Sequence, residues 1–261
     1  MSSTRGTKSI HRAIDLLEAL ADHPQGLSLA ELSEFLEVPK TSVHRILQAL
    51  VERGLVHEDS ELELYSLGIG LLGLSRAVIA GMELRQQARP ILEKLNRKCD
   101  ETVHLGILDD KAVRVIYIDK IESSQPVRLV SKVGQSVPVH CTALGKSLLS
   151  SYSDEELKSL LKNYKFTAFT ENTITSFEDF RKQLVEVNHQ GYSIDNIEYE
   201  DSVVCIASPI TNPDGCVIAA VSISAPETRL RQPDIPKVAA DVVLAAQEVS
   251  ELMSLTSLGL G

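Results

Sequence analysis

The sequence predicts a mixed α/β protein in which a small, mainly helical N-terminal region precedes a larger α+β region. Between residues 9 and 96, apolar residues recur at the three- and four-residue spacing of amphipathic helices. From residue 101 onward, runs of β-branched residues separated by turn signals predict strands, with several helices grouped between them. The 261 residues leave room for two modest domains with ample core.

The first predicted helix covers residues 9–21 and would close a small three-helix core. A second helix begins at Ser28, because Ser28 and Glu31 have the spacing of a capping box. The apolar stripe expected to bury the first helix is Ile10, Ala13, Ile14, Leu17, Leu20 and Ala21.

A third helix is predicted over residues 39–53. Pro39 suits a first helical turn, and Gly54 suits the left-handed residue that follows a helix. Its expected buried stripe is Val43, Ile46, Leu47 and Leu50. Two short helices joined by a tight turn predict a helix-turn-helix. Two short strands at 55–58 and 62–65, separated by an acidic turn, would form a wing behind it.

The side of the third helix that faces away from this stripe is polar. Ser, Thr, His, Arg and Gln side chains bond to phosphates and base edges in a DNA major groove, so we interpret it as a recognition helix. The candidate DNA-contacting residues are Lys40, Thr41, Ser42, His44, Arg45 and Gln48. The alternative is an ordinary helical hairpin whose polar face is only solvated.

The net charge of −10 argues against affinity of the whole surface for nucleic acid. Residues 1–60 carry six Lys or Arg against nine Asp or Glu, so local basic residues must make any phosphate contacts. No apolar run approaches the length of a membrane span, and residues 1–6 do not begin a signal peptide. We therefore expect no membrane contact. The four cysteines have no paired spacing, which predicts a cytoplasmic protein with reduced thiols and no disulfide framework.

Residues 67–96 again have a helical pattern, which Gly81 interrupts. The part before Gly81 is so apolar that it either forms a dimer contact as well as a linker, or packs only on its own chain. The predicted division is a winged helix-turn-helix at 1–67, a linker helix at 68–82 and a C-terminal domain at 83–261.

From residue 101 onward, the C-terminal domain is expected to contain six strands and four helices. Strands are predicted at 102–108, 112–121, 127–133, 192–196, 203–210 and 216–225. Helices are predicted at 142–150, after the capping residue Ser153, from Ser176 to Gly191, and around Val238, Val242, Ala246 and Val249.

The sequence resembles the IclR family of bacterial transcriptional regulators along nearly its whole length. The matching stretches are Leu29–Leu32, Pro39–Arg45, Glu101–Leu105, Gly134–Pro138, Thr142–Lys146, Gly191–Tyr192, Cys205–Pro209 and Ala220–Ser224. The resemblance implies a winged helix-turn-helix and a GAF-like α+β effector-binding domain. It also implies a homodimer or homotetramer on a palindromic double-stranded DNA operator. Within the family the chain looks closest to the branch of sugar-acid catabolism, similar to 2-keto-3-deoxygluconate regulators, which implies a repressor of a catabolic operon.

Chemistry and resemblance together indicate a ligand site. Residues 141–145 enter a helix whose first N–H groups attract a carboxylate, and small residues there let a ligand approach the backbone. Ser222 and Ser224 alternate along a strand and share a face, and Asp195 can accept bonds from ligand hydroxyls. The family's effector contacts correspond to Leu129, Ala143, Leu144, Asp195, Val203, Cys205, Ser222 and Ser224. These residues suit a small carboxylate effector, an oxo, hydroxy or sugar acid.

An enzyme or a metal-binding regulator is the alternative, built on His140, Cys141, Asp195 and Cys205. Adjacent residues of a strand point to opposite faces, so His140 and Cys141 would not readily cooperate. The sequence also has no HExxH, no Gly-x-Ser-x-Gly and no phosphate-binding glycine loop. We therefore predict no enzymatic activity, no metal and no cofactor.

Overall fold

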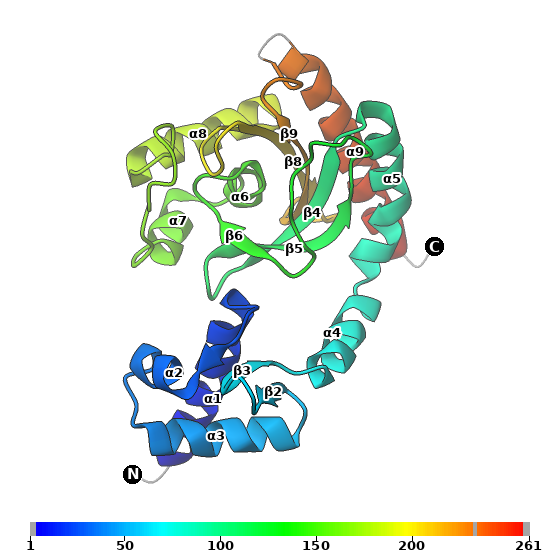
Figure 1. The fold of residues 1–261 in the computed structure, drawn as a ribbon. Helices are drawn as coiled ribbons and strands as arrows, with labels where there is room; N and C mark the ends of the chain where they lie inside the picture. The colour runs from blue at the N-terminus through cyan, green and yellow to red at the C-terminus, as the bar shows by residue number, and fades with distance from the viewer. Residues whose placement is uncertain (1–3, 232–233, 258–261) are drawn as a thin grey trace. The chain divides into compact units, whose positions relative to one another are not determined.

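The computed structural model describes residues 4–231 and 234–257. The chain divides into two compact units, Met1–Gly81 and Met82–Gly261 (Figure 1). Within the described residues, no helix is both long enough and apolar enough to span a bilayer.

The first unit is a helix-turn-helix with a wing, as the sequence predicts. Its elements are α1 (Thr4–Asp22), β1 (Leu27–Ser28), α2 (Leu29–Phe35), α3 (Lys40–Glu52), β2 (Val56–Asp59), β3 (Leu64–Leu67) and α4 (Gly70–Ala80). The three short strands form an antiparallel sheet in the order β1-β3-β2, and the β2–β3 hairpin is the wing. The predicted capping box closes the start of α2, and Gly54 after α3 has a φ of +68°.

The predicted stripe of α1 is wrong in its N-terminal half. Ile10 and Ile14 are 60% and 46% exposed, whereas Leu16, Ala19 and Leu20 are buried. The core of this unit includes residues of α1 only from Ala13 onward, because the two other helices and the small sheet offer no more surface to cover. An amphipathic pattern therefore continues along α1 beyond the part that packs within its own unit.

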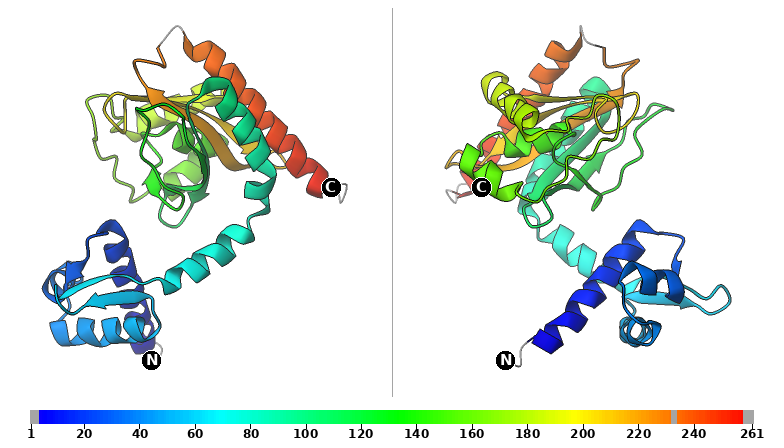
Figure 2. Two further views of the ribbon diagram at one scale, coloured as in Figure 1. Left: turned by 45° about the vertical axis from the view of Figure 1, so that its right-hand side comes forward. Right: turned by 90° about the vertical axis from the view of Figure 1, so that its left-hand side faces the viewer.

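The second unit is an antiparallel six-stranded sheet with helices on both faces. Its elements are α5 (Glu83–Cys99), β4 (Thr102–Asp109), β5 (Arg114–Ile121), β6 (Ser136–Pro138), α6 (Ala143–Leu149), α7 (Asp154–Leu160), α8 (Phe177–Gln190), β7 (Ser193–Asn196), β8 (Val203–Thr211), β9 (Val217–Pro226) and α9 (Ile235–Ser257). The strand order is β6-β5-β4-β9-β8-β7. The two long helices α5 and α9 lie side by side on one face (Figure 2), and α6, α7 and α8 cover the other.

The alternation of side chains along the central strands separates the two faces. Val103 and Leu105 of β4, with Val221 and Ile223 of β9, pack under α5 and α9. The intervening residues His104 and Ser222 are polar, and they face the opposite side of the sheet, which α6 covers. One face of the sheet is therefore an apolar core, and the other can line a cavity.

The strand predicted at 127–133 is wrong. Val127, Val130 and Val133 are exposed and recur every third residue, which does not match the two-residue period of a strand. The carbonyl groups of Leu129 and Ser131 accept hydrogen bonds from the Lys120 ammonium, at 3.5 and 2.8 Å, instead of pairing with a neighbouring strand. The sixth strand is β6, which pairs with β5.

Gly145 brings α6 against the strand that precedes it. A Cβ at this position would lie 2.1 Å from the carbonyl oxygen of Val139 and 2.4 Å from its Cα, so the backbone would have to move. The small residue at 145 therefore serves the packing of the chain on itself. The expectation that small residues of this turn admit a ligand stays a prediction.

Gly145→Ala should lower the free energy of unfolding by about 1–3 kcal/mol or more, because the clash is with backbone atoms. Gly73→Ala is the matched control: it also lies in a helix, no atom is within 4 Å of its added Cβ, and it should stabilise the protein by about 0.5–1 kcal/mol. Urea unfolding curves of both variants against the parent protein measure the difference. Equal stability of the two variants would contradict the close approach of α6 to Val139.

Candidate functional site

The candidate DNA-contacting residues lie on one helix with their side chains free of the core. Val43, Leu47 and Leu50 bury one side of α3. Of the six candidates, four are exposed and two are half-buried: Lys40, Thr41, His44 and Arg45, then Ser42 and Gln48. In the part of the chain that the structure describes, neither Lys40 nor Arg45 has an ion-pair partner. Their charges are therefore available to an external anion.

Gln48 differs from the other candidates because it connects α3 to the wing. Its side-chain amide donates a 3.1 Å hydrogen bond to Glu58 of β2, and the Tyr65 hydroxyl of β3 donates to the same carboxylate at 2.8 Å. Burial and the Glu58 carboxylate raise the pKa of Tyr65 to about 12, so this hydroxyl remains a donor at neutral pH. These contacts fix the wing relative to α3, and a direct role of Gln48 on DNA stays a prediction.

A cavity opens in the second unit between the polar face of the sheet and the first turn of α6. The space between its lining atoms is about 360 Å³, part of which is open to solvent. All eight residues that the family resemblance implies as effector contacts line it: Leu129, Ala143, Leu144, Asp195, Val203, Cys205, Ser222 and Ser224. The structure brings them together, and whether they bind a ligand stays a prediction.

Sequence reasoning missed four further residues of the cavity wall as ligand contacts: Tyr117, Thr142, Tyr199 and Glu200. Tyr117 lies between two isoleucines in β5, so the sequence pattern gave no reason to expect it at a ligand site. Tyr199 and Glu200 follow β7 in a turn, so strand periodicity could not place them. Thr142 was expected only as part of a helix start, where its hydroxyl accepts the Gly145 N–H.

The sheet contributes a row of polar side chains at one level of the cavity. Asp195 pairs with Cys205, Cys205 with Ser224, and Ser224 with Thr102, across the four strands β7, β8, β9 and β4. Residues that are directly opposite in antiparallel strands project to the same face, so this row forms a continuous polar strip. The Cys205 thiol donates to Ser224 Oγ at 3.1 Å within it.

Asp195 is the titratable group of this strip. It is almost fully buried, and this burial raises its pKa from 3.8 to about 7 against the opposing effect of the Glu198 N–H, which donates to its Oδ1 at 2.7 Å. The nearby Glu198 carboxylate raises the same pKa, and the Lys146 ammonium lowers it. Near neutral pH, Asp195 can therefore present either a carboxylate or a hydroxyl donor to a ligand.

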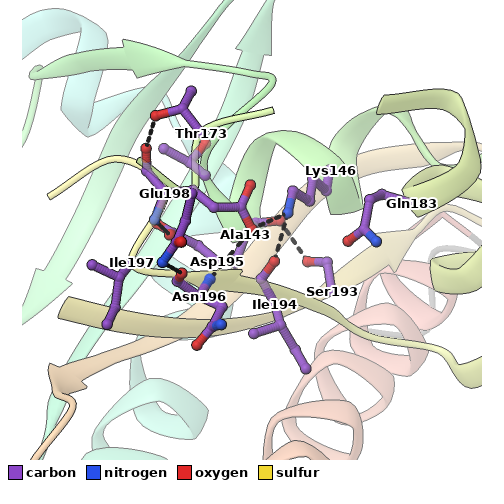
Figure 3. A network of polar contacts seen from close by, with 12 residues as sticks. Ala143, Lys146, Thr173, Gln183, Ser193, Ile194, Asp195, Asn196, Ile197 and Glu198 are labelled. Atoms are coloured by element: carbon purple, nitrogen blue, oxygen red, sulfur yellow. Dashed lines mark hydrogen bonds and ion pairs between the residues drawn. The ribbon is translucent and has the colours of Figure 1, made fainter. Parts of the chain in front are cut away.

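A buried ion pair fixes α6 on β7 behind Asp195 (Figure 3). The Lys146 ammonium donates to Glu198 Oε1 at 2.6 Å and to the Ile194 carbonyl at 2.7 Å. Ser193 Oγ donates to the Ala143 carbonyl at 2.6 Å, and Thr173 Oγ1 donates to the Glu198 carbonyl at the same distance. These bonds hold the first turn of α6 and the end of β7 in one geometry.

The alternative based on cysteine chemistry has no support in this geometry. Burial raises the pKa of both Cys141 and Cys205, so both remain thiols rather than the thiolates that attack a substrate or bind a metal. Both ring nitrogens of His140 contact other groups, the Tyr164 hydroxyl at 2.7 Å and the Thr167 carbonyl at 3.0 Å. Within the described residues, no three His, Cys, Asp or Glu side chains are grouped as metal ligands.

The apolar helix α4 has no buried residue. Leu72, Leu74 and Val78 are each more than half exposed, and Ile69 just before the helix is 85% exposed. Several exposed apolar side chains on one short helix indicate an interaction site.

Comparisons with known proteins agree with this arrangement. The family model of the IclR helix-turn-helix domain matches residues 9–60, and that of the bacterial transcriptional regulator IclR C-terminal domain matches residues 76–251. The chain is 34% identical over 223 residues to the HTH-type transcriptional regulator XynR of Escherichia coli K12, covering 85% of this chain and 88% of XynR. It is 34% identical over 245 residues to KdgR of the same organism, covering 94% and 92%. The crystal structure of Thermotoga maritima IclR superposes with a TM-score of 0.71 at 28% identity, over 95% of this chain and 99% of that one.

Asp195→Asn should remove a pH-dependent cost to stability. The folded-state pKa of Asp195, about 7, lies above the ordinary 3.8, so the stability that the protonated carboxyl contributes is complete below about pH 4 and is lost as the pH rises through 7. The free energy of unfolding of the variant should exceed that of the parent by an amount that grows over this range and then levels off, at no more than about 4 kcal/mol. Urea unfolding of both proteins from about pH 4 to 8 measures it.

Asp201→Asn is the control for the loss of a carboxyl group as such, because Asp201 is exposed and is not among the residues that line this cavity. The pH dependence that belongs to Asp195 is the difference between the two variants. A pH-independent difference for Asp195→Asn would contradict the raised pKa.

Proposed function

Because the chain belongs to the IclR family, whose members are DNA-binding transcriptional regulators and repressors of catabolic operons, we propose that it controls such an operon in response to a small organic acid. The observation that carries the ligand half of this proposal is the polar cavity in the C-terminal unit, with Asp195, Ser222 and Ser224 on its wall.

On DNA, we propose that α3 enters the major groove. Arg45 and Lys40 supply the positive charge that an acidic protein must concentrate locally, while Thr41, Ser42, His44 and Gln48 supply groups that bond to bases or phosphates. The wing is fixed to this helix through Glu58, so helix and wing approach the duplex as one body.

We further propose that the working form is a homodimer or homotetramer on a palindromic site. Two copies related by a twofold axis would place two α3 helices in successive major grooves, about 34 Å apart. The exposed apolar side chains of α4 supply a surface that a second copy of the chain can cover.

In the cavity, we propose that an oxo, hydroxy or sugar acid places its carboxylate near the 142–144 turn and the Ser222 and Ser224 hydroxyls. N–H groups in the first turn of a helix have no acceptor within the helix, and hydroxyls add donors. Asp195 takes the hydroxylated end of the ligand, because a charged carboxylate there would repel the acid group. The wall lacks Lys and Arg among the described residues, so the acid is recognised by neutral donors.

Arg45→Ala should weaken specific operator binding by roughly 1–3 kcal/mol per half-site, because Arg45 lies at the middle of the exposed face of α3. Arg97→Ala, which removes an exposed Arg from α5 in the other unit, is the control for a simple loss of charge. Gel-shift titration with operator and scrambled duplexes measures both affinity and preference. Unchanged affinity and preference would remove Arg45 from the residues that read bases.

Acids should bind the cavity and their amides should not. Calorimetric titration of pyruvate against pyruvamide, and of gluconate against gluconamide, tests the carboxylate site. Asp195→Ala should weaken gluconate much more than pyruvate. Ser222→Ala combined with Ser224→Ala should weaken both acids by about 0.5–1.5 kcal/mol for each neutral hydrogen bond lost. Equal binding of acid and amide would show that no carboxylate site exists there.

A further inference from the structure

A chain of polar contacts leads from the 126–135 segment to the cavity through His104. Ser131 Oγ lies 2.7 Å from His104 Nε2, and Ser224 Oγ lies 3.5 Å from His104 Nδ1. The Cys205 thiol donates to the same Ser224 oxygen. His104 itself does not line the cavity, whereas Ser224 and Cys205 do. The imidazole therefore lies outside the cavity and contacts a hydroxyl group that lines it.

The His104 ring is neutral under ordinary conditions. Its complete burial, together with the Lys120 ammonium, lowers the pKa of His104 to about 3. The ring stacks on Tyr117 with the centroids 4.5 Å apart, which fixes its plane. A neutral imidazole has one N–H donor and one bare acceptor nitrogen, so its tautomer decides the direction of both hydrogen bonds.

The two tautomers leave different hydrogens without a partner. If Nε2 carries the proton, it donates to Ser131, and Ser224 donates to Nδ1. The Ser131 hydroxyl hydrogen then has no acceptor, because within the described residues His104 Nε2 is the only hydrogen-bond partner of Ser131 Oγ. Ser131 is 8% exposed, so this tautomer leaves a buried donor unpaired.

If Nδ1 carries the proton, these donors are satisfied inside the protein. Ser131 donates to Nε2, and Nδ1 donates to Ser224 Oγ, which also accepts from Cys205. One hydrogen is left over, that of the Ser224 hydroxyl, and Ser224 lines the cavity. The unpaired donor then lies where a ligand can use it.

We propose that His104 is a positioning residue, which holds the Ser224 hydroxyl as a hydrogen-bond donor to an acid oxygen of the ligand. This rests on the proposed function, since it assigns the acid class through Ser224. A carboxylate oxygen only accepts, so it matches this polarity, whereas a ligand that offers a hydroxyl hydrogen at this point meets a second donor.

The same contacts tie ligand recognition to the 126–135 segment. Ser131 is the residue of this segment that reaches His104, Leu129 of the same segment lines the cavity, and Lys120 holds the carbonyl groups of both. A ligand acceptor at Ser224 would extend the chain of hydrogen bonds that runs from Ser131 through His104 to Ser224, with every bond donated in the same direction. Hydrogen bonds in such a chain strengthen one another.

Nitrogen NMR of the histidine rings tests the tautomer without any ligand. In full-length protein labelled with ¹⁵N at histidine, the signals lost in His104→Asn identify His104. We expect a neutral ring with the proton on Nδ1, unchanged between about pH 5 and 8. A proton on Nε2, or a charged ring, would overturn the proposal.

Calorimetry with pyruvate tests the positioning role. The amide nitrogen of Asn occupies the place of Nδ1 and can still donate to Ser224, so His104→Asn should stay within a few-fold of the parent affinity. His104→Gln places its amide near Ser131 instead and should lose about tenfold. Thermal unfolding of both variants separates this loss from a loss of fold, and the reverse order of affinities would overturn the proposal.

A double-mutant cycle completes the test. In a Ser224→Ala background, His104→Gln should cause no further loss of pyruvate affinity, because the group that it positions is gone. Independent, additive losses would mean that His104 acts elsewhere. If the parent protein binds neither pyruvate nor gluconate, the acid-effector proposal fails on its own, and the NMR result still decides the direction of the Ser224 hydrogen.

Discussion

The ion pair between Lys146 and Glu198 is the interaction on which the cavity depends. The Lys146 side chain is fully buried, and removing one partner of such a pair leaves an uncompensated charge that costs about 3–5 kcal/mol. The pair joins α6 to the turn after β7, and the Glu198 N–H of that turn holds Asp195 Oδ1. The pair thereby fixes the distance between the helix start at 142–144 and the Asp195 carboxyl, although the two lie about fifty residues apart in the chain. Preorganisation of this kind lowers the entropy that a ligand loses on binding.

The same pair determines the charge of the site. Because Glu198 neutralises Lys146, the cavity offers an acid no formal positive charge. The polar groups of its wall are hydroxyls, a thiol, first-turn N–H groups and the carboxyl groups of Asp195 and Glu200. A charged Asp195 would oppose an anion, but burial raises its pKa to about 7, so the carboxyl takes up a proton at little cost near neutral pH. Thr102 Oγ1, in register with Ser224, is buried without a partner among the described residues and adds to the unpaired polar groups of this face. For the proposed acid effector, neutral donors favour a small acid, because they could not offset the desolvation of a fully hydrated polyanion.

The sequence predicted the parts of the fold that local chemistry decides. The capping residues Ser28 and Ser153, the break at Gly81 and the stripe of α3 are short-range patterns, and the structure confirms each. The cavity residues came from family resemblance, because periodicity could state only that Ser222 and Ser224 share a face. The strand expected at 127–133 is absent because the Lys120 ammonium binds two of its carbonyl groups, an interaction that strand periodicity cannot indicate. Tyr117 and His104 were missed as parts of the site because a buried polar residue in a strand gains its role only from strands that pair with it.

Strand β5 connects the cavity to the start of the second unit. Tyr117 lines the cavity, Lys120 holds the 129–131 carbonyl groups, and Asp119 between them accepts from Arg85 and Arg89 in the first turns of α5. Asp119 Oδ2 and Arg85 Nε are both buried without a partner among the described residues, so this ion cluster is not saturated with hydrogen bonds. A second arrangement of its side chains could therefore form as many hydrogen bonds as the present one. A ligand changes DNA affinity only through different affinities for two arrangements of the protein. This unsaturated cluster, at the residues that follow Gly81 and Met82, is therefore a place where two arrangements of similar energy can exist.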